Sequence, residues 1–285
     1  MKRITVLISL LLFATFFVPH AHAVDVSLKL SGGQSFFQLK SINHLLDHWA
    51  VWKQKDTEAH TDWTYIGGEV SKLHSGFDFA GEIIVAVTSR ITIGIGAGYI
   101  YSELMEDKTA LTIERVVGTF LDVKPIKISA LPILISGYYF FPLSSSSRLY
   151  VMGGAGLVWG KYIEREGRRL TTKDNFTYQA FQRTSGRGSI VLAGCGFEYE
   201  FEPGMRVFFE GSGRLCRISD FQGENNLEET GTLYSFEEYL PEFEIWQAKN
   251  QIMAAQPSGD NFRSVKKAVV DLSGLILRIG LVFKF

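Results

Sequence analysis

"LRIGLVFKF", residues 277–285, alternates apolar side chains with other residues. One face of this stretch holds Leu277, Ile279, Leu281, Phe283 and Phe285. A period of two predicts a β-strand rather than a helix. Chain ends usually fray into water, so a strand that closes on an aromatic residue predicts an apolar setting for that face.

The same period recurs along the chain and predicts eight strands. Their ranges are about 26–37, 74–87, 91–101, 122–141, 149–162, 189–202, 205–218 and 268–285. Most exceed the roughly 9–11 residues that a tilted strand needs to cross a membrane. One face of each is apolar and the other carries glycine or charge. This alternation is compatible with a soluble barrel and with a barrel whose apolar face meets lipid.

The connections between these strands alternate in length. Those at 38–73, 102–121, 163–188 and 219–267 are long and polar, and those at 88–90, 142–148 and 202–204 are short. Aromatic residues gather near both strand ends, as in interfacial girdles. We therefore predict an all-β, eight-stranded antiparallel up-and-down transmembrane β-barrel with both termini at the short-turn end. A membrane hairpin within 42–70 would raise the count to ten.

The first residues predict export. Lys2 and Arg3 precede an apolar run at 4–18, and "AHA" at 21–23 fits a small-x-small cleavage site. This pattern predicts a signal peptide over 1–23 and a barrel domain over 24–285. An uncleaved anchor helix is the alternative, although the run is short of the roughly 20 residues of a full span. The formal net charge of -1 gives no indication of nucleic-acid binding.

The terminal stretch with its aromatic last residue resembles the C-terminal assembly signal of bacterial outer-membrane β-barrel proteins. With the signal peptide, the eight strands and the loop asymmetry, the chain from about 24 to 285 looks like a small barrel of the OmpA/OmpX/OmpW, porin-like type. The resemblance implies insertion by the barrel-assembly machinery and contact with outer-membrane lipid and lipopolysaccharide. It also implies a location in the bacterial outer membrane with both termini periplasmic.

Charged residues on the inner strand faces form the main candidate site. They are Glu198, Glu200, Arg206, Glu210, Arg214 and Arg278, with Lys29, Asp78 and Glu82 as further members. Buried charges are costly unless paired. We predict a salt-bridge network that fills and closes the lumen, with Glu210 paired to Arg278 across adjacent strands. A gated polar pathway is the alternative.

Other chemistry is weakly indicated. His44 and His48 have the i,i+4 spacing of helical metal ligands, but no HExxH motif accompanies them, so we predict solvated loop histidines and no metal or cofactor. His74 and Ser75 are adjacent on a strand and point to opposite faces, so they do not form a nucleophile–base pair. The sequence predicts no enzyme and no catalytic residue; a lipid-modifying outer-membrane enzyme is the least favoured alternative.

The long connections are rich in aromatic residues, and 242–255 has the composition of a short amphipathic helix. Loops of this length are usually functional or disordered. We predict a structural or surface-binding role through extracellular loops, with an extracellular ligand as partner. The main alternative, implied by the OmpW-type resemblance, is a narrow channel for small or hydrophobic molecules.

Overall fold

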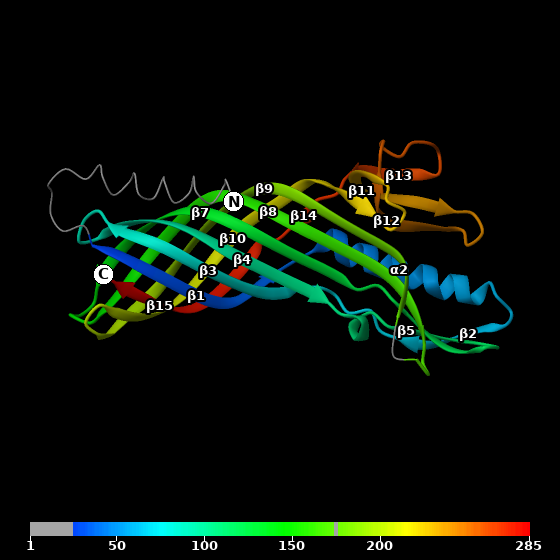
Figure 1. Cartoon of the computed structure of the whole chain (residues 1–285), viewed down its shortest axis with the longest axis horizontal. Helices are drawn as coiled ribbons and strands as arrows, with labels where there is room; N and C mark the ends of the chain where they lie inside the picture. The colour runs from blue at the N-terminus through cyan, green and yellow to red at the C-terminus, as the bar shows by residue number, and fades with distance from the viewer. Residues whose placement is uncertain (1–24, 174–175) are drawn as a thin grey trace.

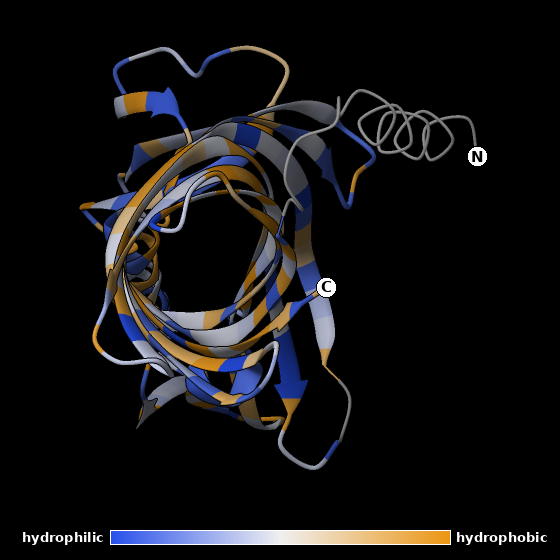
Figure 2. Cartoon of the chain, turned by 90° about the vertical axis from the view of Figure 1, so that its left-hand side faces the viewer, coloured by the Kyte–Doolittle hydropathy of each residue, from blue (hydrophilic) through white to orange (hydrophobic). Residues whose placement is uncertain are grey.

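The computed structural model describes residues 25–173 and 176–285. The predicted signal peptide at 1–23 lies outside the described residues. Within them, fifteen strands form one antiparallel sheet. Eight of these pair in a closed cycle, which we call the ring: β1 (Val26–Phe37), β3 (Ser75–Ala86), β4 (Ile91–Leu104), β7 (Ile126–Pro142), β8 (Ser147–Leu170), β9 (Thr177–Glu202), β10 (Met205–Asn225) and β15 (Gly274–Lys284). Figure 2 shows the ring from its end.

The predicted all-β antiparallel class is confirmed, and the predicted total of eight strands is wrong. Each predicted segment contributes a ring strand, but β8, β9 and β10 continue well beyond their predicted ends. They continue because long connections leave backbone groups that need partners, and paired strands supply them. The hairpin from β8 to β9 stays in register from Ser147↔Tyr199 to Glu164↔Gln182, with one irregularity at Glu166 and Gly167.

Two groups of additional strands extend the sheet from the ring. β6 (Gly118–Val123) pairs with β8 and leads to β5 (Leu111–Arg115) and β2 (Trp63–Gly68). β11 (Thr230–Leu240) pairs with β10 and with β12 (Ile245–Met253) and β13 (Phe262–Lys267), and the short β14 (Val270–Asp271) pairs with β10. A 3-10 turn, η1 (Glu106–Lys108), follows β4. Figure 1 shows β2, β5, β11, β12 and β13 beyond one end of the ring.

The first long connection contains a helix, α2 (Lys40–Glu58), where we predicted a loop. Ile42, Leu45, Leu46 and Trp49 recur at helical spacing and are at most 2% exposed, so burial of this face stabilises the helix. Residues 42–70 therefore form α2 and β2 instead of a membrane hairpin. No helix in the described part of the chain has the length and apolarity to cross a bilayer.

Within 242–255, where the composition suggested an amphipathic helix, Ile245–Met253 form β12 instead. β12 pairs along its whole length with β11, from Leu240↔Ile245 to Thr232↔Met253. Pairing with β11 thus overrides the helical pattern, as tertiary context commonly does.

The outer face of the ring is apolar and exposed. On β7 the outward hydrophobic side chains from Leu131 through Ile133 and Ile135 to Phe141 are between 37% and 63% exposed. At about 3.3 Å per residue and a tilt of about 40°, this stretch is ~25 Å tall, the height of the apolar band of an outer-membrane barrel. On β15, Leu277, Ile279 and Leu281 share this outward face and Phe285 is 80% exposed, whereas Phe283 is half-buried.

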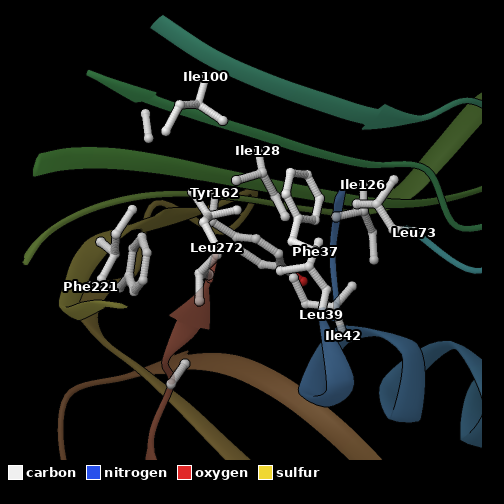
Figure 3. Packing of buried hydrophobic residues seen from close by; sticks show 14 of the residues in the cluster. Phe37, Leu39, Ile42, Leu73, Ile100, Ile126, Ile128, Tyr162, Phe221 and Leu272 are labelled. Carbon is white, nitrogen blue, oxygen red and sulfur yellow. The ribbon is translucent and has the colours of Figure 1, made fainter. Parts of the chain in front are cut away.

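The interior holds two hydrophobic clusters. One lies toward the short turns and includes Tyr138, Tyr150 and Phe208. The other joins the loop end of the ring to α2, where Phe37, Leu39 and Ile42 pack with Ile126, Ile128, Leu73, Tyr162 and Leu272 (Figure 3). The helix is therefore an integral part of the hydrophobic core at the loop end of the ring.

Candidate functional site

An alternating chain of ion pairs crosses the lumen. Asp78 accepts hydrogen bonds from Arg278 at 2.6 and 2.8 Å and from Arg214 at 2.8 Å. Arg278 also contacts Glu210 at 3.3 Å, and Glu210 contacts Lys29 at 2.7 Å. All five side chains are at most 10% exposed. Pairs of this kind, with further hydrogen bonds to their members, meet the requirement that buried charges be compensated.

Strand register explains how these residues meet. Glu210 on β10 lies opposite Arg278 on β15, as the sequence predicted. Gly33 on β1 lies opposite both Asp78 and Arg278. A Cβ added at Gly33 would lie 2.0 Å from the carbonyl oxygen of Leu277. The glycine thus keeps β1 free of a side chain at the level where Asp78 and Arg278 meet across it.

The six predicted lumen charges do not form one network. Glu210, Arg214 and Arg278 belong to the alternating row of ion pairs described above. Glu198 pairs instead with Arg148 at 2.6 Å, and Glu200 pairs with Arg206 at 2.9 Å. These two pairs are separate because they lie nearer the short turns, one on β8–β9 and the other on β9–β10. Arg148 was missed, although its position opposite Glu198 follows from the β8–β9 register.

Aromatic rings complete the closure of the lumen. The ammonium of Lys29 lies 4.6, 4.9 and 4.3 Å from the ring centroids of Tyr138, Tyr150 and Phe208. The Tyr150 hydroxyl donates to Glu210 at 2.9 Å. A small cavity of about 30 Å³ lies at this level, and Lys29, Tyr138, Glu210 and Arg278 are among the residues that line it. The lumen is therefore closed here by charge and aromatic packing together.

A separate buried charge cluster anchors α2. Lys53 on the helix contacts Asp122 at 3.3 Å and Glu166 at 3.0 Å. Lys124 contacts Glu166 at 3.4 Å, and Arg168 donates two hydrogen bonds to Asp122 at 2.5 and 2.7 Å. Burial acts to raise the pKa of Glu166, but the charges of Lys124 and Lys53 outweigh it and hold this pKa at about 2. This cluster fixes α2 to β6 and β8.

A large, partly open cavity lies at the loop end of the ring, and we call it the wall cavity. β10 pairs with β15 up to Arg214↔Gly274 and with β14 from Arg217↔Asp271. The cavity lies beside this change of partner and has a volume of about 1490 Å³. Its lining combines inward residues with outward ones. The inward set includes Phe37, Tyr162 and Arg214, and the outward set includes Phe36, Leu215 and Leu275.

Segments far apart in sequence build the wall cavity. They are the end of β1, the start of α2, β10, and the stretch from Lys266 through β14 to Leu275. Most of the lining surface is apolar. Four cationic side chains line it, Lys40, Arg214, Arg217 and Lys266, against the one carboxylate of Asp271, which bonds to Arg217 at 3.2 Å. Such a site combines an apolar body with an excess of positive charge, as sites for amphipathic ligands do.

The histidine pair lies on one face of α2, with ring centroids of His44 and His48 4.2 Å apart. His44 contacts Glu237 at 3.3 Å, and His48 contacts the backbone carbonyl oxygen of Trp246 at 2.8 Å. Both therefore connect α2 to the β11–β12 hairpin instead of lying free in a loop. The described residues contain no group of three or more His, Cys, Asp or Glu arranged to hold a metal.

Comparisons with known proteins add little. No family model matches the chain, and no curated protein matches its sequence. Among solved structures, the chain is similar to a major outer membrane protein from Thermus thermophilus, at 13% identity and a TM-score of 0.37, over 93% of this chain and 100% of the other. Similarity at that level does not establish a common fold.

Proposed function

We propose that this chain is a bacterial outer-membrane β-barrel that crosses the membrane with the eight strands of the ring. Three features support this. The outer face is an exposed apolar band about as tall as a bilayer core. The interior is polar and paired at mid-height. The long connections gather at one end, which would be extracellular, leaving the short turns and both termini on the periplasmic side.

The closed lumen argues against axial passage of ions. An ion crossing at the level of Glu210 and Arg278 would have to displace buried, mutually paired side chains. The cavity at that level has a volume of only about 30 Å³ and is lined by these side chains. The barrel is therefore better suited to holding the extracellular structure in place than to conducting solutes along its axis.

We further propose a binding, non-enzymatic role centred on the wall cavity. The observation that carries this proposal is a mainly apolar space of about 1490 Å³ that meets both faces of the wall at the edge of the apolar band. Its ligand would be an apolar or amphipathic small molecule that enters from the outer leaflet. This combines the predicted loop-borne ligand site with the predicted alternative of a hydrophobic solute, since the loop segments themselves line the cavity.

The test uses protein refolded in detergent and titrated with the fluorescent apolar probe N-phenyl-1-naphthylamine. Folding is checked by the change in gel mobility on boiling. We expect a saturable fluorescence increase above that of empty micelles, lost in Ala268→Trp because Ala268 lines the cavity and is 4% exposed. Ala193→Trp, on the outer face of β9, is the matched control. Saturable binding that survives Ala268→Trp would refute the site, and the absence of any saturable binding would refute the function.

A further inference from the structure

The wall cavity contains a buried guanidinium whose hydrogen-bonding capacity is not used up. Arg214 lines the cavity and is 3% exposed. Its Nη1 donates to Asp78 at 2.8 Å and its Nε donates to the carbonyl oxygen of Leu272 at 3.0 Å. Its Nη2 has no hydrogen-bond partner within the described part of the chain. A buried hydrogen-bond donor without a partner is energetically costly. A ligand group that accepts a hydrogen bond from Nη2 would therefore gain binding free energy.

The charge of Arg214 is also incompletely balanced. Along the lumen chain, Arg214, Arg278 and Lys29 alternate with only two carboxylates, Asp78 and Glu210. The next carboxylate, Glu82, lies opposite Lys29 at the far end of the chain and accepts a hydrogen bond from Tyr138. Positive charge is thus in excess at the Arg214 end of this row of ion pairs, which is the end that meets the wall cavity.

The mouth of the cavity adds to this excess. Lys40 and Lys266 line it, and both are exposed and without an ion-pair partner among the described residues. The acid–base pair Arg217–Asp271 is internally neutral. Buried and exposed cations therefore face a space whose remaining surface is mostly apolar.

Resting on the proposed function, we propose that the ligand of the wall cavity is a single-chain amphipath with an anionic head. The head accepts a hydrogen bond from Arg214 Nη2. The alkyl chain lies against the apolar lining that includes Phe36, Leu215 and Leu275. The lysines at the mouth attract the anion electrostatically, which acts on its rate of capture more than on its final affinity. The orientation places charge toward the lumen and the alkyl chain toward lipid.

The test compares two probes that differ in the head alone. Hexadecanoate and 1-hexadecanol are each used to displace N-phenyl-1-naphthylamine from the refolded protein at neutral pH. A hydrogen bond to a charged group predicts that hexadecanoate displaces the dye at a concentration at least about tenfold lower. In Arg214→Met this ratio should fall toward one. In Lys284→Gln, which removes a cation outside the cavity lining that is paired with Asp25, the ratio should persist.

The outcomes separate the two proposals. Equal displacement by acid and alcohol in the unmodified protein would overturn the anionic head while leaving the cavity as an apolar site. A preference that persists undiminished in folded Arg214→Met would overturn the role of Arg214. If Arg214→Met fails to fold, Lys40→Gln with Lys266→Gln replaces it, and an unchanged rate of hexadecanoate binding there would count against the proposal. Absence of saturable dye binding would instead refute the proposed function.

Discussion

Replacing Asp78 by Asn is expected to destabilise the protein severely. Asp78 joins Arg214 to Arg278, and it also accepts a hydrogen bond from Ser35 at 3.2 Å. Asn has nearly the same shape and keeps an acceptor oxygen, so the change removes charge more than volume. Both guanidinium groups would then remain buried without this partner.

The expected magnitude follows from the burial of the partners. Removing one member of a buried ion pair costs about 3–5 kcal/mol, because the remaining charge is left uncompensated. Arg278 keeps Glu210, and Asn keeps one acceptor, so we expect a loss of about 3 kcal/mol. The control is Asp25→Asn, which breaks the Asp25–Lys284 pair of 2.8 Å between side chains that are 49% and 37% exposed. Exposed pairs contribute about 0–1 kcal/mol.

The assay is urea unfolding of protein refolded into lipid vesicles, followed by the fraction that keeps the unboiled gel mobility. Asp78→Asn should lower the midpoint clearly, and Asp25→Asn should leave it almost unchanged. Equal midpoints for the two variants would refute the reasoning, because the lumen chain would then contribute no more than a surface pair. A lowered slope in Asp78→Asn would indicate a loss of two-state behaviour instead.

Two further predictions follow from the same charge clusters. Glu210→Arg combined with Arg278→Glu should not restore the stability lost in either single variant. The new arginine would face Lys29, and the new glutamate would face Asp78. Recovery of stability in urea unfolding would show that the Glu210–Arg278 pair is independent of these neighbours. The pKa of Glu166 lies at about 2, below its ordinary value of 4.5, so its stabilisation of α2 is complete above about 4.5 and lost as the pH falls through 2. The effect is on the order of 3 kcal/mol. Hydrogen exchange in α2 should show this acid sensitivity in the unmodified protein and lose it in Glu166→Gln; identical pH profiles would contradict the assignment.

Local periodicity predicted the ring because each ring strand carries its own signal. The alternation of Leu277, Ile279 and Leu281 sets the outward face of β15 without reference to any partner. The short turn at 202–204 fixes the neighbouring strands closely enough to place Glu210 on the inner face. Glu210 and Arg278 were thus predicted as neighbours, and the structure has them in contact at 3.3 Å.

The helix, the additional strands and the wall cavity depend on contacts between distant segments, which the strand periodicity does not predict. The apolar positions Ile42, Leu45, Leu46 and Trp49 did carry a helical signal within a polar stretch, and this signal would have identified α2. The additional strands pair beyond the ring with partners that no local pattern specifies. Local patterns do not predict the wall cavity, because residues of β1, α2, β10 and β14 line it together and it lies beside a change of pairing partner along β10.

The central claim is that the ring spans the membrane with a closed lumen, so that any ligand must use the wall. Ion conductance of the refolded protein in a planar bilayer tests this most directly, with insertion verified by the boiling-dependent gel shift and Arg278→Glu measured alongside. We predict no steady conductance above that of the protein-free bilayer for the unmodified protein. Steady conductance that changes in Arg278→Glu would show that ions pass the buried charge chain, and would contradict the account.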